Sequence, residues 1–89
     1  MLVNLGQLVS SKAGRDQGNY FLVVTKLNDR FVQVVDGRLR KVENPKKKNL
    51  QHLIVHREVA KDIEIKLQEQ KPITNREVRE ALLSLGVTE

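Results

Sequence analysis

Apolar and polar positions in the first half of the chain follow the short-range patterns of β-strands. Residues 19–27 (NYFLVVTKL) are rich in aromatic and β-branched side chains, and the run Tyr20–Val24 is apolar on both faces, as in a buried strand. Shorter runs of similar character occur on either side of it. The sequence thus predicts five strands, at Gln7–Lys12, Asn19–Leu27, Arg30–Val35, Arg38–Val42 and Leu50–His56.

Turn residues separate these strands at short intervals. Asn28-Asp29 suits a two-residue hairpin turn because both residues tolerate positive φ, and Asp36-Gly37 is the stronger hairpin signal. Pro45 is expected to end the fourth strand, since proline cannot donate to a ladder, and residues 46–49 are expected to form a basic loop. Five short strands joined by tight turns predict a small closed barrel, which would leave no exposed edge.

The second half of the chain has helical patterning. Thr74 and Glu77 fit a capping box, apolar residues then recur at helical spacing, and Gly86 stands at a C-cap position. These signals predict a helix over residues 75–85. Residues 58–70 have the Glu, Lys, Gln and Ala content of a helix, although the alternation at 63, 65 and 67 leaves a strand open.

The predicted fold class is mainly β with a C-terminal α-helical part. Residues 1–57 are expected to form the barrel, and residues 58–89 a helical extension that packs on it. Packing is favoured because a small barrel gains buried core from a covering helix. The alternative is that the helices present an apolar face to a partner protein or to a second copy.

Length and composition narrow the class of protein further. A chain of 89 residues predicts one domain. The absence of cysteine excludes disulfides and thiolate metal sites, and it suits a reducing cytoplasm. No apolar run approaches the roughly 20 residues of a membrane span, and the first residues do not have the pattern of a signal peptide. We therefore expect a cytoplasmic protein without membrane contact.

Positive charge is concentrated in one segment of the chain. The net charge is +5, from 16 basic and 11 acidic side chains. Residues 38–52 hold six basic side chains and one acidic one, while the other 74 residues hold ten of each sign. A scattered surplus would indicate only solubility, but a localised surplus indicates a site for an anionic partner.

The glycine loop and the strands beside it resemble a known RNA-binding motif. Residues 6–18 (GQLVSSKAGRDQG), followed by Tyr20–Val24, resemble a KOW motif, in which Gly18 matches the glycine that ends the loop between two strands. Residues 1–55 look like the SH3-like barrel of KOW-domain ribosomal proteins, of the fourteen-e and twenty-seven-e types of the archaeal and eukaryotic large subunit. The stretches SKAGRDQG and DGRLRKVENPKKKNLQHL are similar to small bacterial RNA-binding proteins with a KOW domain. This resemblance implies RNA binding in a ribosomal or transcription setting, and no catalysis.

The basic segment and the KOW loop supply the candidate RNA contacts. Lysine neutralises phosphates without reading sequence, whereas arginine also binds bidentately or stacks. Arg38 and Arg40, two residues apart on the fourth predicted strand, would share one face. The alternative is a solvated loop that only keeps the protein soluble. The expected RNA-binding residues are Lys12, Arg15, Arg38, Arg40, Lys41, Lys46, Lys47, Lys48, Asn49 and His52, and those of the KOW loop are Gly14, Asp16 and Gly18.

Other chemistries have weaker support in the sequence. His52 and His56 could share a zinc ion on a helix, but on a strand they would be about 13 Å apart, so we expect neither metal nor cofactor. With three aromatic residues, base stacking is limited, which favours recognition of folded RNA by backbone and shape. We expect the protein to have neither catalytic activity nor a small-molecule substrate. The expected partner is structured rRNA, with ribosomal proteins as further candidate partners. The alternative is a module that docks an acidic protein of the translation or transcription machinery.

Overall fold

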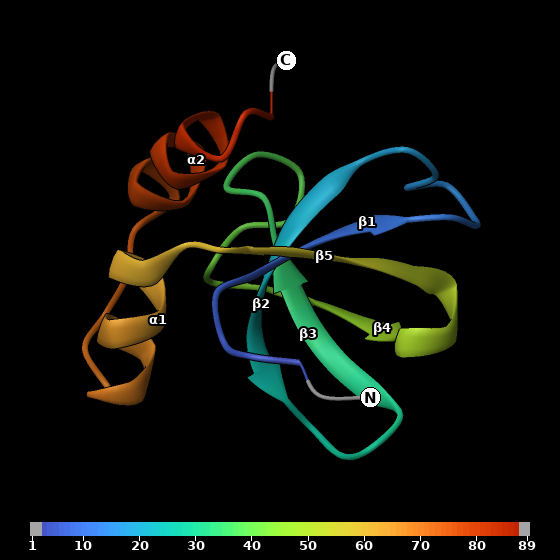
Figure 1. Ribbon diagram of the computed structural model, residues 1–89, viewed down its shortest axis with the longest axis horizontal. Coiled ribbons are helices and arrows are strands. Elements are labelled where there is room, and N and C mark those ends of the chain that lie inside the picture. Colours follow the sequence, from blue (N-terminus) through green and yellow to red (C-terminus); the bar gives the residue numbers. More distant parts are fainter. Residues whose placement is uncertain (1–2, 88–89) are drawn as a thin grey trace.

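A computed structural model describes residues 3–87, in which the strands come first along the chain and two α-helices follow (Figure 1). The elements are β1 (Gln7–Ser11), β2 (Tyr20–Lys26), β3 (Phe31–Val35), β4 (Lys46–Asn49), the 3-10 helix η1 (Leu50–His52), β5 (Leu53–Val59), α1 (Lys61–Gln68) and α2 (Asn75–Ser84). The strands form one antiparallel sheet in the order β4-β3-β2-β1-β5. The predicted class, mainly β with C-terminal helices, is confirmed. Within residues 3–87 the sheet is open, with β4 and β5 as its two edges.

The fourth strand lies elsewhere than the sequence predicted. The prediction of a strand at Arg38–Val42 is wrong, because this segment forms bends and turns. Oδ1 of Asp36 accepts the backbone N–H groups of Arg38 and Arg40, both at 2.9 Å, so these donors are not available to a ladder. The predicted basic loop is instead β4, which pairs with β3 so that Lys48 lies opposite Val32. Lysines suit such an edge strand because their charge discourages pairing with other chains.

The predicted fifth strand begins later and ends later than expected. The side chain of Asn49 accepts the N–H of Gln51 at 2.9 Å and thereby starts η1, so β5 begins at Leu53 and continues to Val59. The expected boundary between residues 57 and 58 therefore falls inside β5. Residues 61–68 are helical, which decides the ambiguity in favour of a helix for most of the segment 58–70.

The predicted capping box at the start of α2 is confirmed. Oγ1 of Thr74 accepts the N–H of Glu77 at 3.1 Å, and Oε1 of Glu77 accepts the N–H of Thr74 at 3.0 Å. Lys66 on α1 also binds the carboxylate of Glu77, which joins the two helices. Gly86 follows the helix with a φ of 94°, as expected for a C-terminal glycine.

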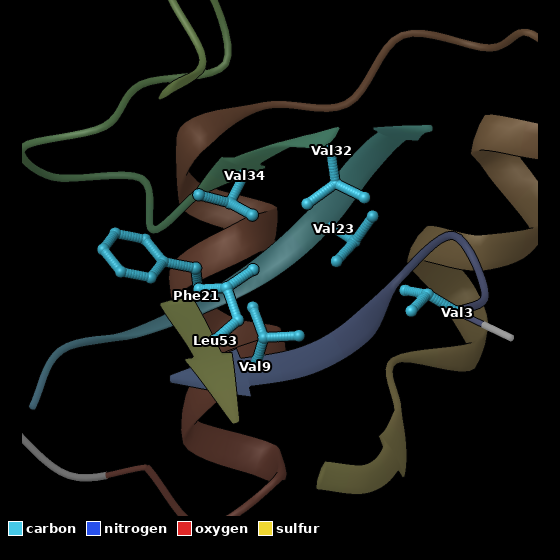
Figure 2. Close-up of a cluster of buried hydrophobic side chains, with 7 residues drawn as sticks. All are labelled: Val3, Val9, Phe21, Val23, Val32, Val34 and Leu53. Carbon is cyan, nitrogen blue, oxygen red and sulfur yellow. The ribbon is translucent and has the colours of Figure 1, made fainter. Parts of the chain in front are cut away.

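The sheet buries apolar side chains on both faces. Figure 2 shows one cluster of seven buried side chains: Val3, Val9, Phe21, Val23, Val32, Val34 and Leu53. The second cluster joins the other face to the helices, which lie together on one side of the sheet in Figure 1: Leu8, Leu22, Val35, Ala60, Ile63, Val78 and Leu82. The alternating membership of residues 21, 22 and 23 confirms that β2 is apolar on both faces, and the helices do pack on the sheet as expected.

The connection from β3 to β4 is fixed against the first turn of α2. Gly37 has a φ of 78°, and a Cβ there would lie 2.5 Å from the backbone oxygen of Asn75, so only glycine allows this approach. Nη1 of Arg79 donates to the Gly37 carbonyl at 2.8 Å, and the N–H of Val42 donates to Oδ1 of Asn75 at 2.9 Å. Residues 36–43 thus have a defined position between the sheet and α2.

Candidate nucleic-acid interface

A buried carboxylate joins three of the segments that carry the predicted RNA-binding residues. Asp16, in the loop between β1 and β2, is only 4% exposed. Nη2 of Arg40 donates to its two carboxylate oxygens at 3.0 and 3.2 Å, and Nζ of Lys48 lies 3.1 Å from Oδ2. We call these three side chains the Asp16 junction. Two of the predicted RNA-binding cations therefore form ion pairs within the protein.

The loop that carries Asp16 is held by its own backbone. The N–H of Gly18 donates to the carbonyl of Ser11 at 2.8 Å, and the N–H of Asn19 donates to the carbonyl of Asp16 at 2.9 Å. Gly14 and Gly18 have φ of 79° and 86°, and a Cβ on either would have open space around it. Positive φ, rather than a close approach of another group, thus explains both glycines.

The junction determines the protonation state of its carboxyl group. Burial by itself would raise the pKa of Asp16, but hydrogen bonds from Lys48 and Arg40 and the charges of both cations lower that pKa below its ordinary value. Asp16 is therefore ionised at neutral pH. Its negative charge offsets part of the charge of the two cations that it binds.

A backbone contact brings a fourth segment to the same end of the sheet. The N–H of Lys12 donates to the carbonyl of His52 at 3.0 Å, which places η1 beside the start of the β1–β2 loop. Residues 12–18, 38–41, β4 and η1 are consequently neighbours. The exposed cations on these segments, apart from Arg38, form what we call the basic rim: Lys12, Arg15, Lys41, Lys46 and Lys47.

The three consecutive lysines of β4 have different surroundings. Lys46 and Lys48 lie opposite Val34 and Val32 and so share their face of the sheet. Only Lys48 reaches Asp16, and its side chain is 12% exposed. Lys47 is on the other face, where its Nζ lies 4.5 Å from the centre of the Phe31 ring in a cation–π contact.

Of three other predicted contacts, two have different surroundings from those expected and the third, His52, does not. Arg38 and Arg40 do not share a strand face, because Arg40 contacts Asp16 while Arg38 lines a groove beside α2. Asn49 is half-buried and caps η1 through its side chain, which is a structural role. His52, at the end of η1, is exposed beside Lys12 and so retains the position of a candidate contact.

The gathered segments carry more than the whole excess charge of the chain. Residues 12–18 and 38–52 contain eight basic and two acidic side chains, a balance of +6 against +5 for the chain. One acid is Asp16, and the other, Glu43, accepts a hydrogen bond from Nδ2 of Asn75 at 2.8 Å. That bond, with a smaller contribution from Lys41, lowers the pKa of Glu43. This end of the sheet therefore has a positive field suited to an anion.

Sequence reasoning missed two contacts of buried or half-buried polar groups. It placed Asp16 in the KOW loop but did not identify its two partners, and the only available signal was an acid directly after Arg15. It also missed the contacts of His56. Nε2 of His56 is 2.9 Å from Oγ of Ser10, and the centre of its ring lies 5.4 Å from that of Tyr20. Between residues 3 and 87, no cluster of three or more His, Cys, Asp or Glu side chains has the arrangement of a metal site.

A comparison with protein-family models and with curated proteins finds no match to this chain. Neither α1 nor α2, the two α-helices within residues 3–87, has the length and apolar character needed to cross a membrane.

Proposed function

We propose that this protein binds structured RNA through the basic rim. In this proposal the curved sheet is an SH3-like barrel of the KOW type, and the protein is a non-catalytic cytoplasmic factor of rRNA or of a ribosome-associated complex. The observation that carries the proposal is the convergence of three cationic segments, with η1 beside them, at one end of the sheet, through the Asp16 junction and the contact of Lys12 with His52. Such a localised basic surface is the electrostatic footprint of nucleic-acid binding.

The chemistry of the rim favours contacts with phosphates. Lysine ammonium groups neutralise phosphate oxygens and release condensed counterions, which makes binding depend steeply on salt. Such contacts position a protein on RNA without reading its bases. The five rim cations are exposed, so RNA reaches them without any rearrangement of the core.

The aromatic side chains give little support to base stacking. Phe21 is fully buried, one face of Phe31 is covered by Lys47, and the ring of Tyr20 lies against His56. Proteins that bind single strands through stacking need open aromatic platforms. Contacts with the backbone of folded RNA therefore fit this surface better.

The Asp16 junction has a supporting role in this proposal. Because Arg40 and Lys48 are held by Asp16, they fix the loop, the β3–β4 connection and β4 relative to one another. The rim cations on these segments are thereby arranged before RNA arrives. A preorganised surface loses less conformational freedom on binding than a flexible basic tail does.

A salt series on folded rRNA fragments tests the proposal. The variant replaces Lys12, Lys46 and Lys47 together by Gln, and the matched control replaces Lys26, Lys61 and Lys71, three exposed lysines outside the four segments. Each phosphate contact contributes a slope of about −0.7 to −0.9 in a plot of log K against log salt concentration. We expect the rim variant to lower the steepness of the slope by about 2 to 3, and the control to leave it nearly unchanged.

Two outcomes would contradict the proposal. If the folded native chain shows no binding to any fragment at low salt, the RNA hypothesis fails and an acidic protein becomes the better candidate partner. If the rim variant and the control weaken binding equally, net charge rather than this surface is responsible. Circular dichroism of the three proteins verifies that they are equally folded.

A further inference from the structure

The connection between β3 and β4 carries two of the cations described above but no strand of its own. It comprises residues 36–45, with Arg40 in the Asp16 junction and Lys41 in the basic rim. Within it, the N–H groups of Asp36 and Gly37 both donate to the carbonyl of Arg40, at 2.9 and 3.1 Å. These bonds shape the turn but do not place it on the rest of the molecule. Connections are usually more mobile than the elements they join, so a defined rim needs contacts that hold this one in place.

Two residues of α2 hold the connection from outside. Asn75 and Arg79 are four residues apart and therefore lie on the same side of the helix. Nη1 of Arg79 donates to the carbonyl of Gly37 at 2.8 Å, and the N–H of Val42 donates to Oδ1 of Asn75 at 2.9 Å. The junction arginine and the rim lysine of the connection lie between these two attachment points along the chain. Their position is therefore set in part from α2, although α2 contributes no side chain to the basic rim.

The amide of Asn75 makes a second contact, with the acid of the connection. Its Nδ2 donates to both carboxylate oxygens of Glu43, at 2.8 and 3.2 Å, and this bond lowers the pKa of Glu43 below its ordinary value. Glu43 is therefore ionised at neutral pH, and it is only two residues from Lys41. A carboxylate that is not held by Asn75 would be free to pair with that lysine and to compete with phosphate for it.

An amide matches both partners of Asn75. A side-chain amide carries an acceptor oxygen and a donor nitrogen, and both are used here. An aspartate would still accept the N–H of Val42, but its second oxygen would face the carboxylate of Glu43, and two adjacent carboxylates repel each other. The contact therefore depends on the chemistry of the residue at position 75 and not only on its size.

We propose that Asn75 is a positioning residue of the RNA site. It holds Val42 and Glu43 on α2, engages the carboxylate, and so leaves Lys41 for a phosphate of the RNA. Asn75 touches no RNA in this proposal, because it acts through the connection. The inference rests on the proposed RNA binding, and it extends the site from the sheet to the helical part of the chain.

Charge-matched variants in the rRNA salt series test the inference. Asn75→Asp should fold, since an acid in the first turn suits a helix N-terminus, but the new carboxylate repels Glu43. We expect the affinity for RNA to fall by about 5-fold or more and the slope of log K against log salt concentration to become less steep by about 1. Arg76→Gln lowers the net charge by the same amount at an exposed position of the same turn, and it should change the affinity by less than about 2-fold.

Two double variants separate the contact from the charge, and both have the net charge of the native chain. Glu43→Gln with Asn75→Asp pairs an amide with a carboxylate again, in the opposite direction. Glu80→Gln with Asn75→Asp restores only the net charge and leaves two carboxylates side by side. We expect the first to return to within about 2-fold of the native affinity and the second to stay as weak as Asn75→Asp. Without RNA, hydrogen exchange at the amides of residues 40–43 should be faster in the second than in the first.

The possible failures of this inference and of the proposed function are distinguishable. Equal affinity of a native chain that binds RNA and of Asn75→Asp would overturn the positioning role and would leave RNA binding by the rim intact. Equal affinity of the two double variants would overturn it as well, because net charge alone would then explain the results. If the native chain binds no rRNA fragment, the proposed function fails and this inference fails with it. Circular dichroism verifies that all the variants are folded.

Discussion

The Asp16 junction and the basic rim use the same residue types from the same segments, yet their cations have different surroundings. Lys48 is largely buried and paired with Asp16, while Lys46, two residues earlier on the same face of β4, is exposed. Arg40 and Lys41 differ in a similar way, since Arg40 reaches Asp16 and Lys41 is exposed. Neighbouring cations are thus divided between a structural role and a surface role.

The division follows from a single buried acid. A carboxylate removed from water is stable only when charged or polar partners replace its hydration, so Asp16 requires the nearest cations. Those cations are then much less accessible to an external anion. A run of lysines in a sequence consequently overstates the number of charges that a phosphate backbone can reach.

Removal of the Asp16 carboxylate should have the largest effect on the free energy of unfolding. Asp16→Asn keeps the shape of the side chain but leaves Arg40 and Lys48 without a counter-charge. We expect the free energy of unfolding to fall by about 2–3 kcal/mol, less than the ~3–5 kcal/mol of a fully buried pair, because Arg40 retains contact with water. Urea unfolding followed by circular dichroism measures the change. A loss below about 0.5 kcal/mol, the range of ordinary surface substitutions, would show that the junction does not stabilise the fold.

Two single lysine changes on β4 sharpen the comparison. Lys48→Gln removes one ion pair of Asp16 and should lower the free energy of unfolding by about 1–2 kcal/mol, whereas Lys46→Gln should change it by less than about 0.5 kcal/mol. For RNA affinity the order should reverse, with the larger reduction of the salt slope in Lys46→Gln. Chemical denaturation and a salt series on the same two proteins give both values. If the two variants behave alike in both measurements, the distinction between junction and rim is wrong.

Several elements of the fold were predictable because their signals are local. The helix α2 begins at a capping box formed by residues only three apart, Thr74 and Glu77. Strands β2 and β3 are joined at the predicted place, where Oδ1 of Asn28 accepts two backbone N–H groups. The predicted two-residue turn is wrong in detail, because the connection spans residues 27–30 and neither Asn28 nor Asp29 has a positive φ. By contrast, β4 has the sequence KKKN, which has low intrinsic strand preference. Pairing with β3 makes it a strand, and that tertiary contact is not visible in its own sequence.

The candidate site was predictable at the level of segments but not of individual roles. Charge concentration identified the stretch that contains β4 and η1, and the resemblance added the loop of Asp16. The partners of Asp16 are distant along the chain, with Arg40 separated from it by 24 residues. The side chain of Asp36 also redirected residues 38–40 into a turn, which separated Arg38 from Arg40. Such contacts depend on the packed fold rather than on spacing in the sequence.

Lowering the pH should weaken the Asp16 junction gradually, as Asp16 becomes protonated, whereas the Asp16→Asn substitution removes the charge at every pH. The pKa of Asp16 is lower in the folded chain than its ordinary value of about 4. The carboxylate therefore contributes stability above the unfolded pKa, and this contribution is lost as pH falls through the folded pKa. Glu43 and Glu77, whose pKa values are also lowered, follow the same direction, so the pH dependence of the native chain alone does not isolate the contribution of Asp16.

The difference in unfolding free energy between the native chain and Asp16→Asn isolates the contribution of Asp16, because Glu43 and Glu77 are present in both proteins. That difference should be constant above about pH 5 and should narrow below about pH 4 as Asp16 itself becomes neutral. A difference that does not depend on pH would mean that the charge of Asp16 is not what holds Arg40 and Lys48 at the junction.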